Sequence, residues 1–150
     1  MELTVDQALQ QGIAAHKEGK LQDAERLYRA ILQAQPKHPD ANHNLGVLAV
    51  AVGKPLEAIP FFKIALEANP QIEQFWLGYI DTLMSVERFD EVQRAIVECE
   101  KSGVSSDKLD ALKQRLQENV PNDTNKTVTG PTLKEKRKKL AEKKKSKKRK

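Results

Sequence analysis

The chain has 150 residues, enough for one domain of ordinary size, and its net charge of +5 is unevenly distributed. Of its 26 Lys and Arg residues, 12 lie in residues 133–150, which contain only two acidic residues, so the rest of the chain is net acidic. No run approaches about 18 consecutive apolar residues, which argues against a transmembrane segment, and a single cysteine excludes an internal disulfide.

The N-terminal residues predict a helix start and no leader sequence. Thr4, followed three residues later by Gln7, is typical of a capping box that opens the first helix. The chain begins without the basic and apolar regions of a signal peptide. We therefore expect a cytoplasmic protein, or a nuclear one if the source is eukaryotic.

The next part of the chain repeats itself with a period of 34 residues. Five positions recur, and the pairs are Gly12 and Gly46, Gly19 and Gly53, Ala24 and Ala58, Tyr28 and Phe62, and Pro36 and Pro70. The period and these residue types resemble the tetratricopeptide repeat, a helix-turn-helix unit. The resemblance implies an all-α, right-handed solenoid of helical hairpins, a class of scaffold that binds other proteins.

Three repeats are expected, each with a first helix, helix A, and a second helix, helix B. They occupy residues 5–38, 39–72 and 73–106. The third is degenerate, because Trp76 and Tyr79 mark its helix A but the glycines and the proline are missing. In the second, Asn42 stands where the family usually has Trp, so we expect a thinner contact between its two helices.

Glycine and proline positions predict how the helices pack. Gly12 and Gly46 lack a Cβ atom, which should let helix B approach helix A closely. Gly19 and Gly53 are expected in the turns between the helices. Pro60 falls inside a predicted helix, where a proline costs about 3 kcal/mol, so we expect a kink.

The chain after the repeats divides into three segments. Residues 107–118 are expected to form a capping helix with leucines on one side, although they could instead begin a further repeat of a longer protein. Residues 119–132 are a polar linker, and residues 133–150 are a Lys/Arg-rich tail that we expect to be disordered.

The sequence offers little support for catalysis. The spacing of His38 and His43 matches no usual zinc site, and there is no phosphate-binding loop or nucleophile motif. Cys99 is expected to be a buried small residue. The sequence therefore predicts no enzyme activity, no metal and no cofactor. Because such arrays are often attached to catalytic domains, the non-catalytic repeat region of a larger transferase remains an alternative.

The resemblance also implies a binding groove, because the A helices of this family line the concave face of the solenoid. Only Asn44 matches the family's clamp for acidic C-terminal peptides, so we expect another kind of peptide or a partner helix. Some apolar positions, Leu9, Val47 and Leu77, could instead pack between helices. The predicted groove residues are Leu9, Ile13, His16, Lys17, His43, Asn44, Val47, Val50, Leu77, Asp81 and Met84.

The basic tail supports a separate hypothesis. It has no aromatic residue to stack on bases, so its attraction to nucleic acid or another polyanion would be purely electrostatic. The residues concerned are Lys134, Lys136, Arg137, Lys138, Lys139, Lys143, Lys144, Lys145, Lys147, Lys148, Arg149 and Lys150.

Two functions follow from these observations. The first is a protein-interaction scaffold or adaptor whose groove binds a peptide while the tail tethers the complex to a polyanion. The alternative is a nucleic-acid-associated protein in which the tail is the primary binding element. Self-association is a further expectation, because no polar helix precedes the first repeat to cover its outer face.

Overall fold

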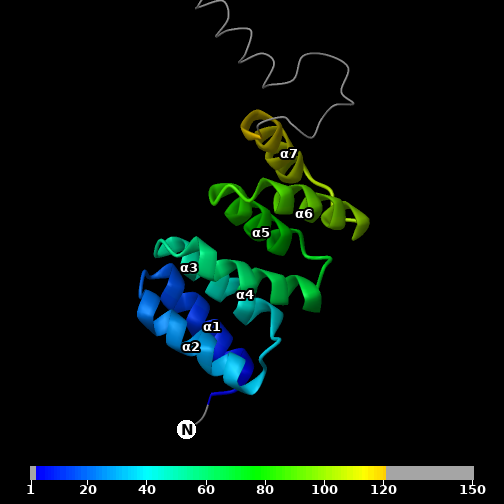
Figure 1. Cartoon of the computed structure of the whole chain (residues 1–150). Coiled ribbons are helices and arrows are strands. Elements are labelled where there is room, and N and C mark those ends of the chain that lie inside the picture. The colour runs from blue at the N-terminus through cyan, green and yellow to red at the C-terminus, as the bar shows by residue number, and fades with distance from the viewer. Residues whose placement is uncertain (1–2, 121–150) are drawn as a thin grey trace, which may run out of the picture. The chain divides into compact units, whose positions relative to one another are not determined.

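The structure, a computed structural model, describes residues 3–120 (Figure 1). This part of the chain contains seven helices and no strand, which confirms the predicted all-α class. The helices are α1 (Val5–Lys17), α2 (Leu21–Ala34), α3 (Pro39–Ala51), α4 (Pro55–Ala68), α5 (Glu73–Ser85), α6 (Phe89–Lys101) and α7 (Asp107–Asn119). Each expected repeat therefore contains two helices, and the first compact unit of the chain ends at Leu112, within α7.

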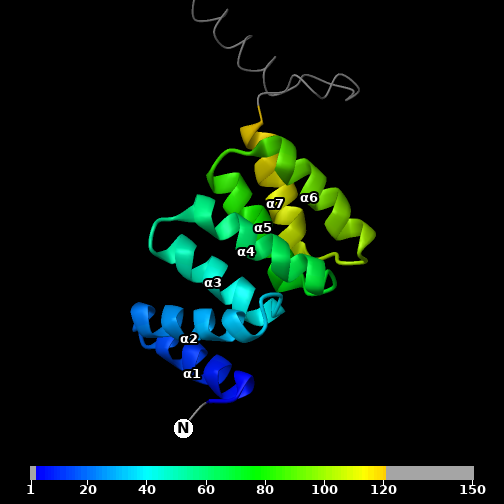
Figure 2. The same ribbon diagram turned by 60° about the horizontal axis from the view of Figure 1, so that its bottom comes forward.

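Successive helices pair as antiparallel hairpins that stack on one another. Within a hairpin, α1 packs on α2, α3 on α4 and α5 on α6, while α2 packs on α3 and α4 on α5 to join one hairpin to the next (Figures 1 and 2). The A helices also meet directly, α1 with α3 and α3 with α5. This arrangement is the predicted helical-hairpin solenoid. Among the described residues, no helix has the length and apolar character needed to cross a bilayer.

The first helix begins with the predicted capping box. The Thr4 hydroxyl oxygen accepts a hydrogen bond from the backbone N–H of Gln7 at 3.1 Å, and the Gln7 side-chain oxygen accepts one from the backbone N–H of Thr4 at 3.0 Å. Two N–H groups that would otherwise lack a partner at the helix start are thus satisfied.

The predicted role of the helix A glycines is confirmed. A Cβ atom built on Gly12 would lie 2.6 Å from Cε1 of Tyr28, and one on Gly46 would lie 2.6 Å from Cε1 of Phe62. Real Cβ atoms do not approach other atoms so closely, so any larger residue would force the ring or the helix that carries it to shift. The ring of helix B occupies the space that glycine leaves.

The turns between helices A and B have a left-handed backbone. Gly19 and Gly53 have φ of +79° and +81°, as their position in the turn predicts. In the third repeat, the equivalent residue is Glu87, which has φ of +60°. A side chain in this region costs roughly 1–2 kcal/mol, so the third repeat keeps the same turn at the expense of local strain.

The unusual Asn42 is a structural residue. It is 1% exposed, and its Nδ2 donates hydrogen bonds to the backbone oxygens of Pro36 at 3.1 Å and His38 at 2.8 Å. The indole N–H of Trp76, at the same position of the third repeat, donates to the backbone oxygen of Pro70 at 2.6 Å. The expected thin contact is not seen, because α3 and α4 pack closely around the Phe62 ring.

Two further expectations concern helix interiors and the end of the repeats. α4 is assigned as one helix from Pro55 to Ala68 with Pro60 exposed inside it, and the expected kink remains a prediction. In α7, Leu109, Leu112 and Leu116 are all buried, as the leucine spacing predicts for one apolar side of a helix.

Candidate functional site

The A helices carry the residues predicted for a groove, and nine of the eleven are reached by solvent. Lys17, Val50 and Asp81 are exposed. The other six are partly exposed, namely Leu9, Ile13, His16, Asn44, Val47 and Leu77. We call these nine residues the A-helix surface. Because α1 contacts α3 and α3 contacts α5, the surface extends across three neighbouring helices.

The prediction that His43 and Met84 face an open groove is corrected. His43 is 6% exposed and Met84 is 5% exposed. The His43 ring stacks on Phe75, with ring centroids 4.7 Å apart, and lies 5.5 Å from the Phe62 ring. Burial lowers the pKa of His43, so the neutral imidazole is favoured. Both side chains lie within the packing and are not open to a ligand.

The apolar members of the A-helix surface differ in how far they are available. Leu9 and Ile13 pack partly against the core of the first repeat, while the imidazole of His16 lies edge-on to the Tyr28 ring at 6.4 Å. Val50 is the most exposed, at 39%. The side chain of Val50 therefore offers the clearest apolar contact point on this surface.

The residues considered for catalysis have structural roles. His38 accepts a hydrogen bond at Nδ1 from the backbone N–H of Ala41 and so caps α3. Cys99 is fully buried, 3.8 Å from the backbone oxygen of Val104, and burial raises the pKa of its thiol to about 11. Within residues 3–120 there is no group of three His, Cys, Asp or Glu placed to hold a metal.

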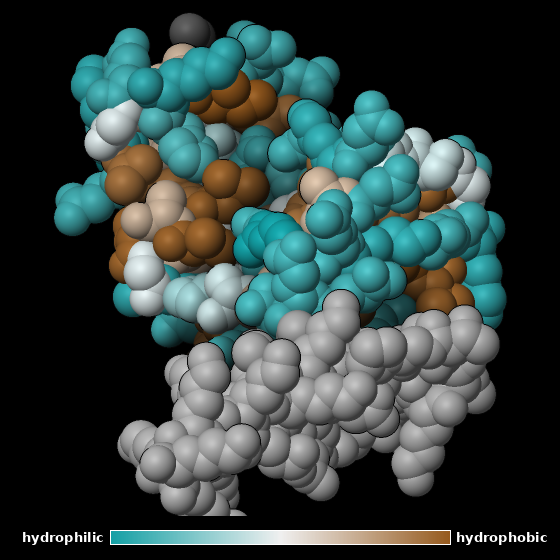
Figure 3. All heavy atoms as spheres, turned by 90° about the horizontal axis from the view of Figure 1, so that it is seen from above, coloured by the Kyte–Doolittle hydropathy of each residue, from teal (hydrophilic) through white to brown (hydrophobic). Residues whose placement is uncertain are grey.

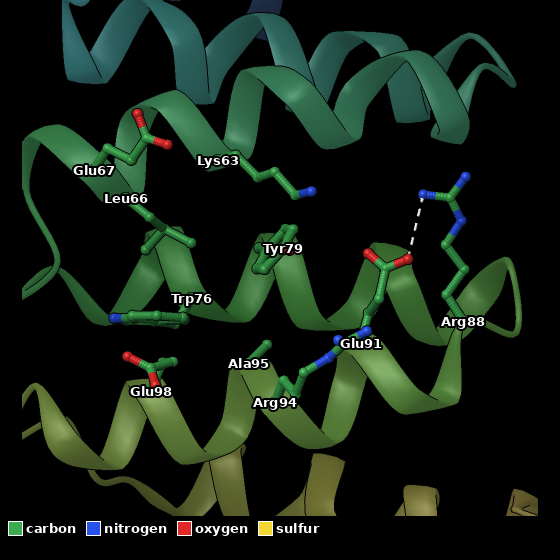
Figure 4. Close-up of a pocket in the computed structure, with 10 residues that line it drawn as sticks. All are labelled: Lys63, Leu66, Glu67, Trp76, Tyr79, Arg88, Glu91, Arg94, Ala95 and Glu98. Atoms are coloured by element: carbon green, nitrogen blue, oxygen red, sulfur yellow. Dashed lines mark ion pairs between the residues drawn. The ribbon is translucent and has the colours of Figure 1, made fainter.

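A second feature, which the sequence reasoning missed, lies between the B helices. A cleft of about 270 Å³ is lined by residues of α2 and α4, with residues of α3 between them. A larger cleft of about 460 Å³ is lined by residues of α4 and α6, with residues of α5 between them. We call them the repeat 1–2 cleft and the repeat 2–3 cleft. The latter is lined by Lys63, Leu66, Glu67, Trp76, Tyr79, Arg88, Glu91, Arg94, Ala95 and Glu98 (Figure 4).

The repeat 2–3 cleft combines an aromatic floor with charged walls. Trp76 and Tyr79 are 6% and 9% exposed and form its floor, with Lys63 above Tyr79 in Figure 4. Arg88 Nη1 lies 3.7 Å from a carboxylate oxygen of Glu91. Burial, together with the Glu91 charge, raises the pKa of the Tyr79 hydroxyl, although Arg94 and Arg88 oppose this. The charged walls could have been found in the sequence by comparing equivalent positions of consecutive B helices.

The described surface is not uniformly polar. On the face shown in Figure 3, apolar side chains form several separate patches between polar ones. Scattered exposed apolar side chains are normal on a protein surface, whereas binding sites for small ligands are usually concave. The twelve Lys and Arg residues predicted to bind a polyanion, Lys134 to Lys150, lie outside the described residues.

Helical hairpins stacked at a period of 34 residues define a helical repeat protein. The particular repeat is identified by a comparison with sequence families. Residues 9–73 match the model of the tetratricopeptide repeat family. A search of curated proteins finds no match.

Several solved structures share the fold of this chain. The tetratricopeptide repeat domain of Sgt2 from Aspergillus fumigatus is 18% identical, with a TM-score of 0.66, over 84% of this chain and 91% of that one. A mutant of MamA is 26% identical, with a TM-score of 0.65, over 77% and 67%. The first tetratricopeptide repeat domain of Spaghetti (RPAP3), bound to an HSP90 peptide, is 14% identical, with a TM-score of 0.66, over 77% and 94%. These likenesses confirm the predicted fold.

Proposed function

We propose that this chain is a protein-interaction scaffold that binds a peptide segment or a partner helix along the A-helix surface. The observation that carries the proposal is the direct contact of three A helices, which places apolar and polar side chains on neighbouring elements. A peptide laid across them would bury Ile13 and Val50, while the Asn44 amide hydrogen-bonds its backbone.

The comparisons support this function indirectly. Spaghetti (RPAP3), which has the same fold, was solved with an HSP90 peptide bound, so the fold is compatible with peptide binding. His38 caps α3, His43 is buried between aromatic rings and Cys99 is buried, which favours a scaffold over an enzyme. A binding role of this kind requires no cofactor.

The basic tail is the second part of the proposal. Residues 133–150 would tether the scaffold to a polyanion through charge alone, and such a contact weakens steeply as salt increases. In the alternative function, the tail binds nucleic acid and the repeats only recruit other proteins. The net charge of this segment favours neither version, so an experiment must separate them.

The test is an affinity capture from source lysate with the full chain and with residues 1–120, each at low and high salt and with nuclease. We expect the truncated form to retain its partners at high salt. Partners that are lost with the tail, with salt or with nuclease would instead favour the nucleic-acid function.

Two variants test the A-helix surface itself. We expect Val50→Glu and Asn44→Ala to weaken capture of the retained partners. The matched control is Leu56→Glu, because Leu56 is a 57% exposed apolar residue of α4, outside the A-helix surface. If Leu56→Glu weakens capture as strongly as Val50→Glu, the A-helix surface is not the binding site.

A further inference from the structure

The two clefts between B helices are built from equivalent positions of the repeat. Five pairs of residues, each 34 positions apart, line both clefts. The pairs are Arg29 and Lys63, Leu45 and Tyr79, Lys54 and Arg88, Glu57 and Glu91, and Phe61 and Ala95. Four of the pairs keep the charge or the bulk of the side chain, and the fifth does not.

In the repeat 1–2 cleft, the chain supplies its own aromatic ring. Phe61 lies partly buried against the core that includes Leu45 and Leu48, and the Arg29 guanidinium carbon is 6.0 Å from the centre of its ring. A cation at this distance from an aromatic face is attracted to it. Phe61 therefore lines this cleft beneath a basic residue.

In the repeat 2–3 cleft, the position equivalent to Phe61 carries no ring. Ala95 stands at the position of Phe61, and this cleft has a volume of about 460 Å³ against about 270 Å³ for the repeat 1–2 cleft. Its volume falls in the range of small-ligand sites. Lys63 stands at the position of Arg29, so a ring placed over Ala95 would lie beneath an ammonium group as Phe61 lies beneath a guanidinium group.

The charges around Tyr79 indicate what should accompany such a ring. Lys63, Arg88 and Arg94 surround this end of the cleft with Glu91 as the single carboxylate, and Glu91 already pairs with Arg88. Glu67 and Glu98 lie toward the other end of the cleft, with Glu98 beside Trp76 (Figure 4). The Tyr79 end is thus complementary to a negative charge.

We propose that the repeat 2–3 cleft binds an aromatic side chain of a partner protein that has an acidic residue beside it. The ring takes the place that Phe61 takes in the neighbouring cleft, and the acidic residue pairs with Arg94 or Lys63. Aromatic anchors held in pockets are typical centres of protein interfaces. The site shares no residue with the A-helix surface, so the two can be tested independently.

The probe is the peptide acetyl-Gly-Asp-Phe-Asp-Gly-amide, titrated into the full chain up to millimolar concentration. Two control peptides replace Phe by Ala, or both Asp residues by Lys. Trp76 is the only tryptophan, so its fluorescence and its indole N–H signal report directly on the cleft. We expect the probe to shift both signals, and each control peptide to bind at least about tenfold more weakly.

Ala95→Phe places in the repeat 2–3 cleft a ring equivalent to that of Phe61 in the repeat 1–2 cleft. The added ring should weaken binding of the probe about tenfold or more. Ala68→Phe, an exposed alanine of the same helix as Lys63, is the matched control and should bind as the unchanged protein does. If Ala95→Phe does not fold, Arg94→Glu decides, because it should weaken the Asp-flanked probe but not the Lys-flanked peptide.

Three results would overturn the proposal. One is equal binding of all three peptides, and another is undiminished probe binding by both Ala95→Phe and Arg94→Glu. The third is a Trp76 signal that changes with protein concentration in the absence of peptide, which would mean that a second copy of the chain occupies the cleft.

Discussion

In repeat 2 the ring of Phe62 occupies the space opposite Gly46, whereas the equivalent positions of repeat 3 hold two isoleucines. Ile80 and Ile96 are 0% and 5% exposed. One large and one minimal side chain have been exchanged for two of intermediate size. The helices still pair in both repeats, which indicates that the pair of positions must supply a total volume and not a particular residue.

Repeats 2 and 3 also form the same side-chain hydrogen bond and the same turn with different residues. Asn42 and Trp76 both donate a hydrogen bond to a proline carbonyl six residues earlier, although one is an amide and the other an indole. Gly53 and Glu87 adopt a left-handed backbone, although only one is suited to it. Repeat 3 therefore keeps the geometry of the family after losing much of its residue pattern.

The largest effect on the free energy of unfolding is expected when only one of the two isoleucines of repeat 3 is placed in repeat 2. Gly46→Ile places bulk where a Cβ atom would already lie 2.6 Å from the Phe62 ring, and should lower the free energy of unfolding by about 3 kcal/mol. Adding Phe62→Ile should recover part of this, with a coupling of about 1–3 kcal/mol between the two changes. Urea denaturation of the unchanged protein, both single variants and the double variant measures this coupling energy. Strictly additive effects would show that the two positions do not share one volume.

A smaller loss is expected when the donor at the Trp position is removed. Asn42→Ala leaves the carbonyls of Pro36 and His38 without the side-chain N–H, and should cost about 2 kcal/mol. Asn44→Ala, two residues away on the same helix, is the control and should change the unfolding free energy by less than about 0.5 kcal/mol. Similar losses in both variants would refute a special role for Asn42.

The turn residues should respond in opposite directions. Glu87→Gly relieves a left-handed backbone and should raise the free energy of unfolding by about 1 kcal/mol, whereas Gly53→Glu should lower it by a similar amount. Thermal unfolding of the two variants beside the unchanged protein is sufficient. A destabilising Glu87→Gly would mean that the Glu87 side chain contributes more than its backbone costs.

The smallest effect concerns pH. Because burial lowers the pKa of His43 in the folded state, the unfolded chain binds this proton more readily. The contribution of His43 to stability is present above the ordinary histidine pKa of about 6.5 and is lost as the pH falls through the lower, folded value. His43→Gln should remove this part of the pH dependence. An unfolding free energy that falls equally with acid in both proteins would contradict the prediction.

The sequence was most informative where one residue meets a neighbour at a fixed spacing. The Thr4 capping box and the close approach of helix B to helix A at Gly46 both follow from local geometry, and both were predicted. The burial of His43 was not, because it depends on Phe75, which comes from the next repeat. The repeat 2–3 cleft was also missed, since the space above Ala95 exists only once α4 and α6 lie on either side of α5.

The order of contacts along the chain has a consequence for biosynthesis. In the described residues, the main contacts join each helix to the next helix or to the next but one. No element of the first two repeats must wait for a distant part of the chain, and folds with such local contacts form quickly. The main contacts of each helix can therefore form once the next one or two helices have been translated, without waiting for the rest of the chain.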